Sequence, residues 1–252
     1  MNIRVLGAFG SEGPGQRPSA FLVNDRTLVD AGSVASGLCV SEQLSIDAVL
    51  LTHAHLDHVV GAAFLAETFA TSGAGRAVTI AALPPVIESV RTGIFNNVIW
   101  PDFSAIPREA PALTYRGLLP DQDYQFGALR VMAIPVDHTV PTSGFIVHDG
   151  TSGFVYSGDT GPTESLWKTA RMVGGIRAVL VECAFPNRMR ELATISRHMT
   201  PERLQRERDK MPPDVPIFVY HVKPAFASEI ADELAKLGGD ISVVAQDKTY
   251  TL

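Results

Sequence analysis

The sequence has one dense cluster of metal-type side chains, in the stretch 53–58, which reads His-Ala-His-Leu-Asp-His. Three of the seven histidines of the chain lie in this stretch. Imidazole nitrogen and carboxylate oxygen are ligands of borderline divalent ions such as Zn²⁺. His53 and His55 are two residues apart, so an extended chain points both to one side. Asp57 and His58 come later and can aim at a second point. The spacing favours a metal site over a polar loop with incidental histidines.

The elements on either side must position these side chains. The apolar run 47–52 ends just before His53 and predicts a buried strand, and the stretch 59–69 predicts a helix. Three more expected strands end in isolated residues of the same type, namely His138, Asp159 and His221. Each of these alone is a common turn residue. Together with the first cluster they make seven ligands that one edge of a sandwich could gather.

The remaining pattern predicts an α/β fold. Strands are expected at 3–6, 20–23, 27–29, 78–82, 113–115, 123–126, 129–136, 143–148, 153–157, 178–182, 217–220 and, as the last one, 241–245. Helices are expected at 84–90, 163–172, 225–236 and 201–210, the last with Thr200 as N-cap. Strands come first and then alternate with helices in each half. This order is typical of an αββα sandwich, two packed sheets with helices outside, in one domain over residues 1–252.

Composition limits the class of protein and its partners. Forty-six per cent apolar residues predict a globular protein with a large core, and a net charge of −6 argues against long nucleic acids as partners. Cys39 and Cys183 make no disulfide framework, so we expect two buried free thiols and a reducing compartment. No segment approaches the length of a membrane span, and the N-terminus lacks a signal sequence. We expect a cytoplasmic protein that does not bind membranes.

Three features remain open from the residues alone. The glycine-rich segment 7–18 lacks a Gly-Lys-Ser/Thr ending, so a P-loop is not expected. Asp30 could orient a metal ligand or only cap a turn. Residues 91–112 form a long irregular segment that contains Asn96, Trp100 and Phe103. Such a segment could be a substrate-binding lid with an aromatic residue near a base, or a packed surface loop.

The set of ligands, in this order and spacing, resembles the metallo-β-lactamase superfamily. By that resemblance His53, His55 and His138 hold one metal ion. The second ion is held by Asp57, His58 and His221, and Asp159 bridges the two. A metal pair about 3.5–4 Å apart can clamp an in-line displacement at phosphorus. Imidazole-rich sites suit zinc, and manganese and iron are also compatible.

A narrower resemblance is to the class II cyclic-nucleotide phosphodiesterases, over roughly residues 1–245. It is carried by the stretches 52–58, 95–103, 181–187, 196–201 and His221-Val222-Lys223-Pro224. One departure is the run 59–63, where the family tends to have a small hydroxyl further along the helix. The resemblance implies hydrolysis of 3′,5′-cyclic nucleotides, cAMP or cGMP or both, to nucleoside 5′-monophosphates. By analogy it also implies a homodimer.

His198 is not needed as a metal ligand, which suggests another task. Phosphodiester hydrolysis expels an alkoxide that needs a proton, and a histidine held by a carboxylate can donate it. The related tRNA-processing nucleases carry a similar pair. We therefore expect His198 as general acid and Glu182 as its orienting partner, against the alternative of a structural contact. Asp57 joins them as a catalytic residue, and Lys223 contacts phosphate or only caps a strand.

Three other functions are weighed against this reading. A tRNA 3′-processing endonuclease would need a basic surface or arm, and the sequence has no basic Gly/Pro-rich insertion. A thioester or lactam hydrolase would leave Glu182 and His198 without a role. A metal-free scaffold would have no reason to keep seven ligands.

Overall fold

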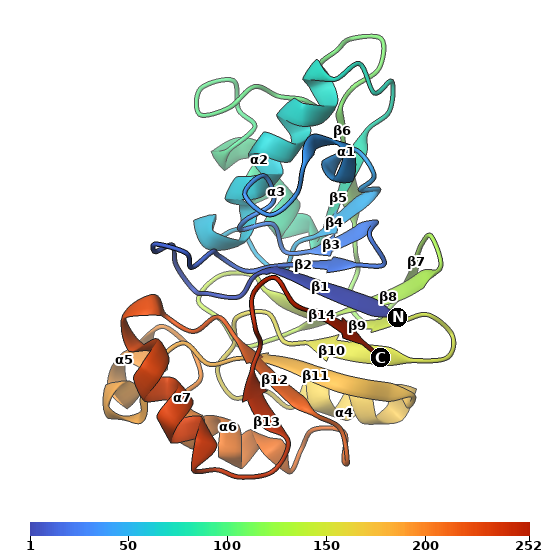
Figure 1. Ribbon diagram of the computed structural model, residues 1–252. Helices are drawn as coiled ribbons and strands as arrows, with labels where there is room; N and C mark the ends of the chain where they lie inside the picture. Colours follow the sequence, from blue (N-terminus) through green and yellow to red (C-terminus); the bar gives the residue numbers. More distant parts are fainter.

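The strands of the chain assemble into two sheets that pack face to face in the computed structural model, which describes residues 1–252 (Figure 1). One sheet contains β1 (Asn2–Gly7), β2 (Ala20–Val23), β3 (Thr27–Val29), β4 (Ala48–Leu50), β5 (Val78–Ala82), β6 (Leu113–Gly117) and β14 (Thr249–Thr251). The other contains β7 (Asp123–Phe126), β8 (Leu129–Pro135), β9 (Ser143–His148), β10 (Gly153–Tyr156), β11 (Ile176–Glu182), β12 (Ile217–Tyr220) and β13 (Ile241–Val243). The strand orders are β14-β1-β2-β3-β4-β5-β6 and β13-β12-β11-β10-β9-β8-β7.

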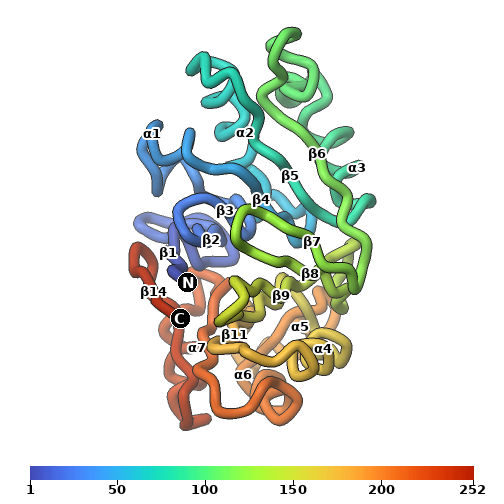
Figure 2. The backbone as a smooth tube through the Cα atoms, turned by 90° about the vertical axis from the view of Figure 1, so that its right-hand side faces the viewer, coloured from blue at the N-terminus to red at the C-terminus, as the bar shows by residue number.

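Helices cover the outer face of each sheet. Over the first sheet lie α1 (Val40–Gln43), α2 (Leu56–Thr71) and α3 (Pro84–Gly93). Against the second lie α4 (Ser165–Val173), α5 (Arg190–Ile195), α6 (Pro201–Arg208) and α7 (Ala227–Ala235), with single 3₁₀ turns at Asn187–Met189 and Pro224–Phe226. Figure 2 shows the N-terminal half, blue to green, stacked on the C-terminal half, yellow to red. The expected αββα sandwich is confirmed.

The interface between the sheets is apolar and aromatic. Phe21 of β2 meets Tyr156 of β10 and Tyr220 of β12 edge to face, with ring centroids 5.3 Å apart in both pairs. These rings belong to a core of 48 buried residues, and a second core of 18 buried residues lies between the second sheet and its helices. Aromatic side chains dominate core energetics because each buries a large area.

Most expected elements are present, and the N-cap of α6 is confirmed, since the Thr200 hydroxyl accepts from the Arg203 N–H at 3.4 Å. The expectation that the chain's last strand is 241–245 is wrong. β14 follows it and pairs with β1, which places the two termini side by side (Figure 1). Its sequence, Thr-Tyr-Thr, is too short to stand out. Tyr250 nevertheless packs on Phe218, with ring centroids 4.7 Å apart.

The sequence does not predict the short helices α1 and α5, because helices of four and six residues show little periodicity. The expectation of two buried thiols is half wrong. Cys183 is buried, but Cys39 is exposed at the start of α1. None of the helices is both long enough and apolar enough to span a membrane.

Strand direction explains why distant residues converge. β4 runs parallel to β3 and β5, and β10, β11, β12 and β13 run parallel to one another. Residues that follow the carboxyl ends of parallel strands meet in the crevice outside the sheet. The two sheets therefore bring the segments after β4, β10 and β12 to one place.

Candidate metal centre

The histidine stretch occupies the turn from β4 into α2. Thr52 and His53 are fully buried, and His55 is the N-cap residue of α2 with extended backbone angles. This extended entry lets His53 and His55 point to the same side, as their spacing predicts. Asp57 and His58 then fall in the first helical turn. The local structure is the strand end and helix start that the sequence indicates.

The structure brings all seven expected ligands together. One group contains His53, His55, His138 and Asp159, and another contains Asp57, His58 and His221, with the potential ligand atoms of each group within 4.8 Å of one another. Asp159 lies at the centre. Its Oδ1 is 3.3 Å from His58 Nε2, and its Oδ2 is 3.6 Å from His53 Nε2 and 3.2 Å from His221 Nε2.

Buried polar atoms without hydrogen-bond partners indicate that this cluster is built for cations. Four such atoms are His53 Nε2, His58 Nε2, His221 Nε2 and Asp159 Oδ1. A buried polar atom left unpaired is costly, so a native structure needs a reason for each one. Imidazole nitrogens around a carboxylate are a donor set that suits divalent metal ions. The residues present therefore fit divalent metals.

Asp30 holds one ligand from behind. Its carboxylate accepts from the Thr52 N–H at 2.9 Å, from the Tyr156 hydroxyl at 3.0 Å and from His58 Nδ1 at 2.7 Å. The bond to His58 keeps the proton on Nδ1 and directs Nε2 to the cluster. Asp30 is completely buried and has a left-handed backbone, with φ 55°. Of the two roles left open by the sequence, the geometry favours orientation of a ligand.

Burial lowers the pKa of four of these imidazoles, those of His53, His55, His138 and His221, and brings the pKa of His138 to about 4. Desolvation disfavours an imidazolium, so these rings are neutral, which is the form that binds metal. His58 differs. Burial alone would lower its pKa, but the carboxylates of Asp159 and Asp30 outweigh burial and raise it well above its usual value. Metal binding at His58 would therefore release a proton.

The glycine-rich loop 7–18 encloses His221. The Gly10 N–H donates to the Val222 carbonyl at 3.1 Å, and the His221 N–H donates to the Ala8 carbonyl at 2.7 Å. A Cβ on Gly10 would lie 2.7 Å from Cδ2, Nε2 and the carbonyl oxygen of His221. Glycine is required here because the backbone touches the imidazole. The loop therefore supports His221, and, as expected, its sequence has no P-loop motif.

His198 and Glu182 form a buried pair next to the cluster. His198 Nδ1 lies 2.7 Å from Glu182 Oε1, and the backbone N–H groups of Thr160, Ala184 and Met199 also donate to this carboxylate at 3.0–3.3 Å. Burial alone would lower the pKa of His198, but the charge and hydrogen bond of Glu182 raise it. Its ring lies 5.1 Å from the ring of His138 and 5.5 Å from that of His221.

Lys223 reaches the edge of the cluster. Its Nζ donates to the Gly10 carbonyl and lies 3.7 Å from Asp57 Oδ2. Lys223 follows the end of β12 by three residues, and its side chain is about one quarter exposed. The Lys223 ammonium group thus links the loop 7–18 to Asp57, and its contact with phosphate stays a prediction.

Part of the segment 91–112 is buried in the core. Phe103 is 5% exposed and packs against Phe95 in the core, so the expectation that it stacks on a base needs correction. Trp100 packs edge to face on Phe64 of α2, with ring centroids 5.6 Å apart. The Asn96 side chain accepts from the N–H groups of the two residues at the loop tip. The aromatic rings of the segment therefore pack against the protein, while Trp100 Nε1 is buried without a hydrogen-bond partner. A substrate-binding role of the rest of the segment stays a prediction.

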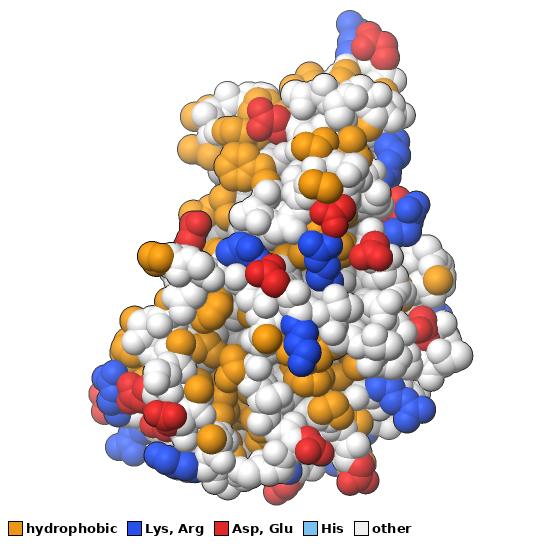
Figure 3. All heavy atoms as spheres, in the orientation of Figure 1, with side chains coloured by type: hydrophobic (Ala, Val, Ile, Leu, Met, Phe, Trp, Pro, Cys, Tyr) orange, Lys and Arg blue, Asp and Glu red, His pale blue; other side chains and the backbone are white.

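The tip of this loop contributes to an apolar surface patch. Val98 is 86% exposed, Ile99 65% and Phe64 45%. Figure 3 shows hydrophobic side chains gathered over α2 and the loop that follows α3.

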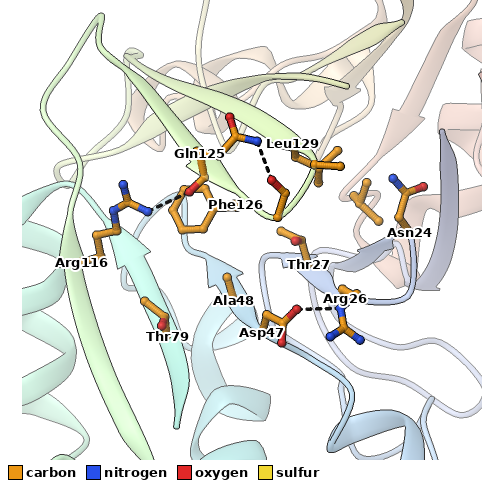
Figure 4. A pocket seen from close by; sticks show the side chains of 13 residues that line it. Asn24, Arg26, Thr27, Asp47, Ala48, Thr79, Arg116, Gln125, Phe126 and Leu129 are labelled. Carbon is orange, nitrogen blue, oxygen red and sulfur yellow. Dashed lines mark hydrogen bonds and ion pairs between the residues drawn. The ribbon is translucent and has the colours of Figure 1, made fainter. Parts of the chain in front are cut away.

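A cavity of about 310 Å³ lies at the other end of the strands (Figure 4). It is lined at the start of β4 by Asp47 and Ala48 and on the other side by Arg116 and Phe126. The Arg26–Asp47 pair, with Nε and Oδ2 2.7 Å apart, lies at its rim. The histidines follow the end of β4, so this cavity is separate from the metal-type cluster.

Two residues that support histidines of the cluster were not predicted from the sequence. Thr52 Oγ1 lies 2.9 Å from His53 Nδ1, and the Arg197 carbonyl lies 3.2 Å from His138 Nδ1. Thr52 could have been suspected because it precedes the first ligand. Arg197 has no such signal, since its partner is 59 residues away.

Comparisons with known proteins agree with this geometry. A family model described as "Beta-lactamase superfamily domain" matches residues 26–220. A probable 3′,5′-cyclic-nucleotide phosphodiesterase of Yersinia pestis is 28% identical over 207 residues, which are 72% of this chain and 58% of that protein. The chain thus matches little more than half of that relative.

A ribonuclease Z of Mycobacterium sp. (strain KMS) is 26% identical over 234 residues, which are 86% of this chain and 79% of that protein. The crystal structure of unliganded yeast PDE1 is similar in fold, with a TM-score of 0.83 at 20% identity and coverage of 100% of this chain and 99% of that chain.

Proposed function

The chain belongs to the beta-lactamase superfamily, and within it we propose that the protein is a metal-dependent phosphodiesterase that converts 3′,5′-cyclic nucleotides to nucleoside 5′-monophosphates. One observation carries the proposal: a buried Glu182–His198 pair adjoins a cluster of metal-type ligands. A phosphodiester needs both cation stabilisation and a proton for its leaving alkoxide. Similarity to proteins named cyclic-nucleotide phosphodiesterases supports the same class.

The seven ligands are assigned to two divalent ions, with zinc as the expected metal. His53, His55 and His138 belong to one ion, and Asp57, His58 and His221 belong to the other, with Asp159 between them. When bound, such a pair would activate water and neutralise charge on the phosphoryl oxygens. Asp57 is assigned a catalytic as well as a ligating role, and the nearby ammonium group of Lys223 is assigned to the phosphate.

His198 is assigned as the general acid. Its Nδ1 is bound to Glu182, which leaves Nε2 free to donate a proton to the departing ribose 3′-oxygen. The raised pKa of His198 favours the protonated ring, and an acid must be protonated before it can donate. Glu182 holds the ring in place and stabilises its charge. A substrate-binding role for Asn96 and Trp100 stays a prediction, whereas Phe103 is buried in the core. A homodimer in the cytoplasm also stays a prediction.

A tRNA 3′-processing endonuclease is the second candidate, because a ribonuclease Z matches 86% of the chain. The two activities share the chemistry at phosphorus and differ in the rest of the substrate. A net charge of −6 favours a small substrate, since long nucleic acids bind best to basic surfaces.

A substrate panel separates the two candidates. Zinc-loaded protein is incubated with cAMP, cGMP, 2′,3′-cyclic nucleotides, linear dinucleotides and a precursor tRNA, and the products are identified by mass spectrometry. We expect 3′,5′-cyclic nucleotides to be hydrolysed to 5′-monophosphates with the highest kcat/KM. Cleavage of the precursor tRNA at its 3′ end, without turnover of cyclic nucleotides, would assign the protein to the second class.

A further inference from the structure

Arg197 joins two parts of the site that are far apart in the sequence. It precedes His198 and follows α5, whereas His138 follows β8. Its backbone is left-handed, with φ 54°. A residue with a Cβ rarely adopts this conformation, and it persists only where its surroundings hold it there.

Two hydrogen bonds run between Arg197 and His138 in opposite directions. His138 Nδ1–H donates to the Arg197 carbonyl at 3.2 Å, and Arg197 Nη1 donates to the His138 carbonyl at 2.7 Å. A carbonyl only accepts, so the first bond places the proton on Nδ1 and leaves the Nε2 lone pair free. That nitrogen lies 3.3 Å from His55 Nδ1, inside the cluster. The second bond, from the Arg197 side chain to the His138 carbonyl, holds the same two residues together.

The same segment positions His198. The His198 N–H donates to the Ala193 carbonyl at 2.8 Å, and the rings of His198 and His138 are 5.1 Å apart. Because Arg197 and His198 share a peptide unit, a rotation of the Arg197 backbone would move both imidazoles.

We propose that Arg197 is a positioning residue that sets the tautomer and orientation of His138 and, through the shared backbone, the place of His198. The part that concerns His198 rests on the proposed function, whereas the part that concerns His138 depends only on metal binding. A role of Arg197 in fold stability alone is less well supported by its contacts. The ion pair of Arg197 with Asp137, with Nη1 and Oδ1 3.1 Å apart, has both side chains about half exposed, and such pairs contribute little stability.

The test uses three variants of Arg197 and one control. Arg197→Ala removes the guanidinium and introduces no new backbone strain, because both residues carry a Cβ. Arg197→Gly removes the guanidinium and also relieves the left-handed conformation. Arg197→Lys keeps the charge but replaces the planar guanidinium, whose Nη1 contacts both the His138 carbonyl and Asp137 Oδ1. Arg206→Ala is the control, since Arg206 pairs only with Glu202 on α6 and its side chain is 72% exposed.

Zinc affinity is measured by competition with a chromophoric chelator, and the apoprotein Tm by calorimetry. Loss of a group that orients a metal ligand typically costs about 10–100-fold in affinity. All variants keep the Arg197 carbonyl, so any loss comes from the missing Nη1 bond to the His138 carbonyl. We expect a loss in this range for Arg197→Ala and Arg197→Gly, a smaller loss for Arg197→Lys and none for the control. Arg197→Gly should have a Tm equal to or above that of the wild type. Weaker zinc binding without lower stability is a result that a merely structural residue would not give.

The rate on a cyclic nucleotide is then compared with the rate on bis(p-nitrophenyl) phosphate at saturating zinc. We expect Arg197→Gly to lose more on the cyclic nucleotide, whose leaving group needs the acid. Wild-type zinc affinity in both Arg197→Ala and Arg197→Gly would overturn the inference. So would a loss of affinity confined to variants with a lower Tm. If the wild type hydrolyses no cyclic nucleotide, the proposed function fails, but the zinc measurements still decide the role toward His138.

Discussion

At the scale of single residues, the site is defined by what each imidazole touches on its outer side. Four imidazole rings have a hydrogen-bond partner at Nδ1, which leaves Nε2 for the cluster. The partners are Thr52 Oγ1 for His53, the Asp30 carboxylate for His58, the Arg197 carbonyl for His138 and, at 3.5 Å, Ser19 Oγ for His221. A partner at one nitrogen fixes the tautomer and the ring orientation. These contacts therefore direct four imidazole nitrogens toward one cluster.

His198→Ala tests the general acid. A ribose alkoxide is a poor leaving group, whereas a nitrophenolate leaves almost unaided. Removal of a general acid typically costs about 10²–10⁴-fold in rate, so we expect this loss on a cyclic nucleotide and much less on bis(p-nitrophenyl) phosphate. Zinc content should be unchanged, and Glu182→Gln should give the same order of substrates in milder form. Equal losses on both substrates would assign His198 to binding or structure, and loss of zinc would make it a ligand.

The pH profile gives an independent check on His198. Its pKa is raised, and the acid acts only when protonated, so kcat/KM for the cyclic nucleotide should fall as pH rises through that raised pKa. Glu182→Gln removes the charge that raises the pKa, so the alkaline limb should move to lower pH. A limb that stays in place in Glu182→Gln would point to another group.

Asp159→Ala tests the centre of the cluster. Asp159 is buried within 3.6 Å of three imidazole nitrogens, and these histidines hold its pKa well below the usual value even though burial alone would raise it. Removal of this charge should abolish both metal retention and activity. Elemental analysis of the purified variant measures the result, and occupancy by two ions per chain would contradict the bridging assignment.

At the scale of elements, loops that look similar in composition have different tasks. The loop 7–18 lies against the imidazole of His221, whereas the segment 91–112 is closed by its own hydrogen bonds and by core contacts. A glycine in the first loop is needed for close approach, and an aromatic ring in the second is needed for packing. Each difference leads to a test.

Gly10→Ala should weaken metal binding without changing any ligand. The added Cβ would lie 2.7 Å from three atoms of His221, one of them in the backbone, so the ring or the loop must move. Overpacking of this kind typically costs about 1–3 kcal/mol. The control is Gly93→Ala, where a Cβ meets nothing within 4 Å. Zinc titration of both variants measures the effect, and equal affinities would show that the loop adapts freely.

Phe103→Ala should destabilise the fold and leave substrate binding unchanged. Removal of a buried phenylalanine typically costs about 3–5 kcal/mol, because a cavity remains. Urea unfolding measures this loss, and Val98→Ala, at an 86% exposed position, should stay within about 0.5 kcal/mol of wild type. An increased KM for cyclic nucleotides in Phe103→Ala at full folding would restore the segment to the substrate site.

At the scale of the whole molecule, the cluster lies between the two halves of the chain, so metal binding and folding are coupled. The ligands follow β4 in one sheet and β8, β10 and β12 in the other. Ions that bind only the folded state stabilise it by about 2.7 kcal/mol at 100 times Kd. Removal of metal should therefore loosen the contact between the sheets.

Chelation should lower Tm, and the Tm of the apoprotein should be lower at pH 5 than at pH 7. In the apoprotein, burial lowers the pKa of His53, His138 and His221, that of His138 to about 4. Between pH 6.5 and about 4 the unfolded chain takes up protons that the folded one does not, so the free energy of unfolding falls as pH falls. His58 and His198, whose pKa values are raised, act in the opposite direction, but the four histidines with lowered pKa values, His55 included, outnumber them. Calorimetry at pH 7 and pH 5, with and without zinc, measures this, and an apoprotein with a higher Tm at pH 5 would contradict it.

Much of the fold could be predicted because its signals are local. β2, β5, β9 and β12 have the bounds that their apolar runs indicate, and the spacing of His53, His55 and His58 places them at one strand end. Hydrophobic periodicity and ligand spacing are properties of a few consecutive residues. The sequence by itself therefore determined the sandwich class and the seven candidate ligands.

The tertiary structure alone decided which residues support those ligands. Asp30 and Arg197 act on histidines 28 and 59 residues away, and β14 exists because it pairs with β1. Phe103 lies in a segment whose aromatic residues suggest a binding surface, but its side chain is buried like that of a core residue. Such roles depend on which strand ends meet and which rings are covered. These are contacts between distant segments, and only packing of the two sheets creates them.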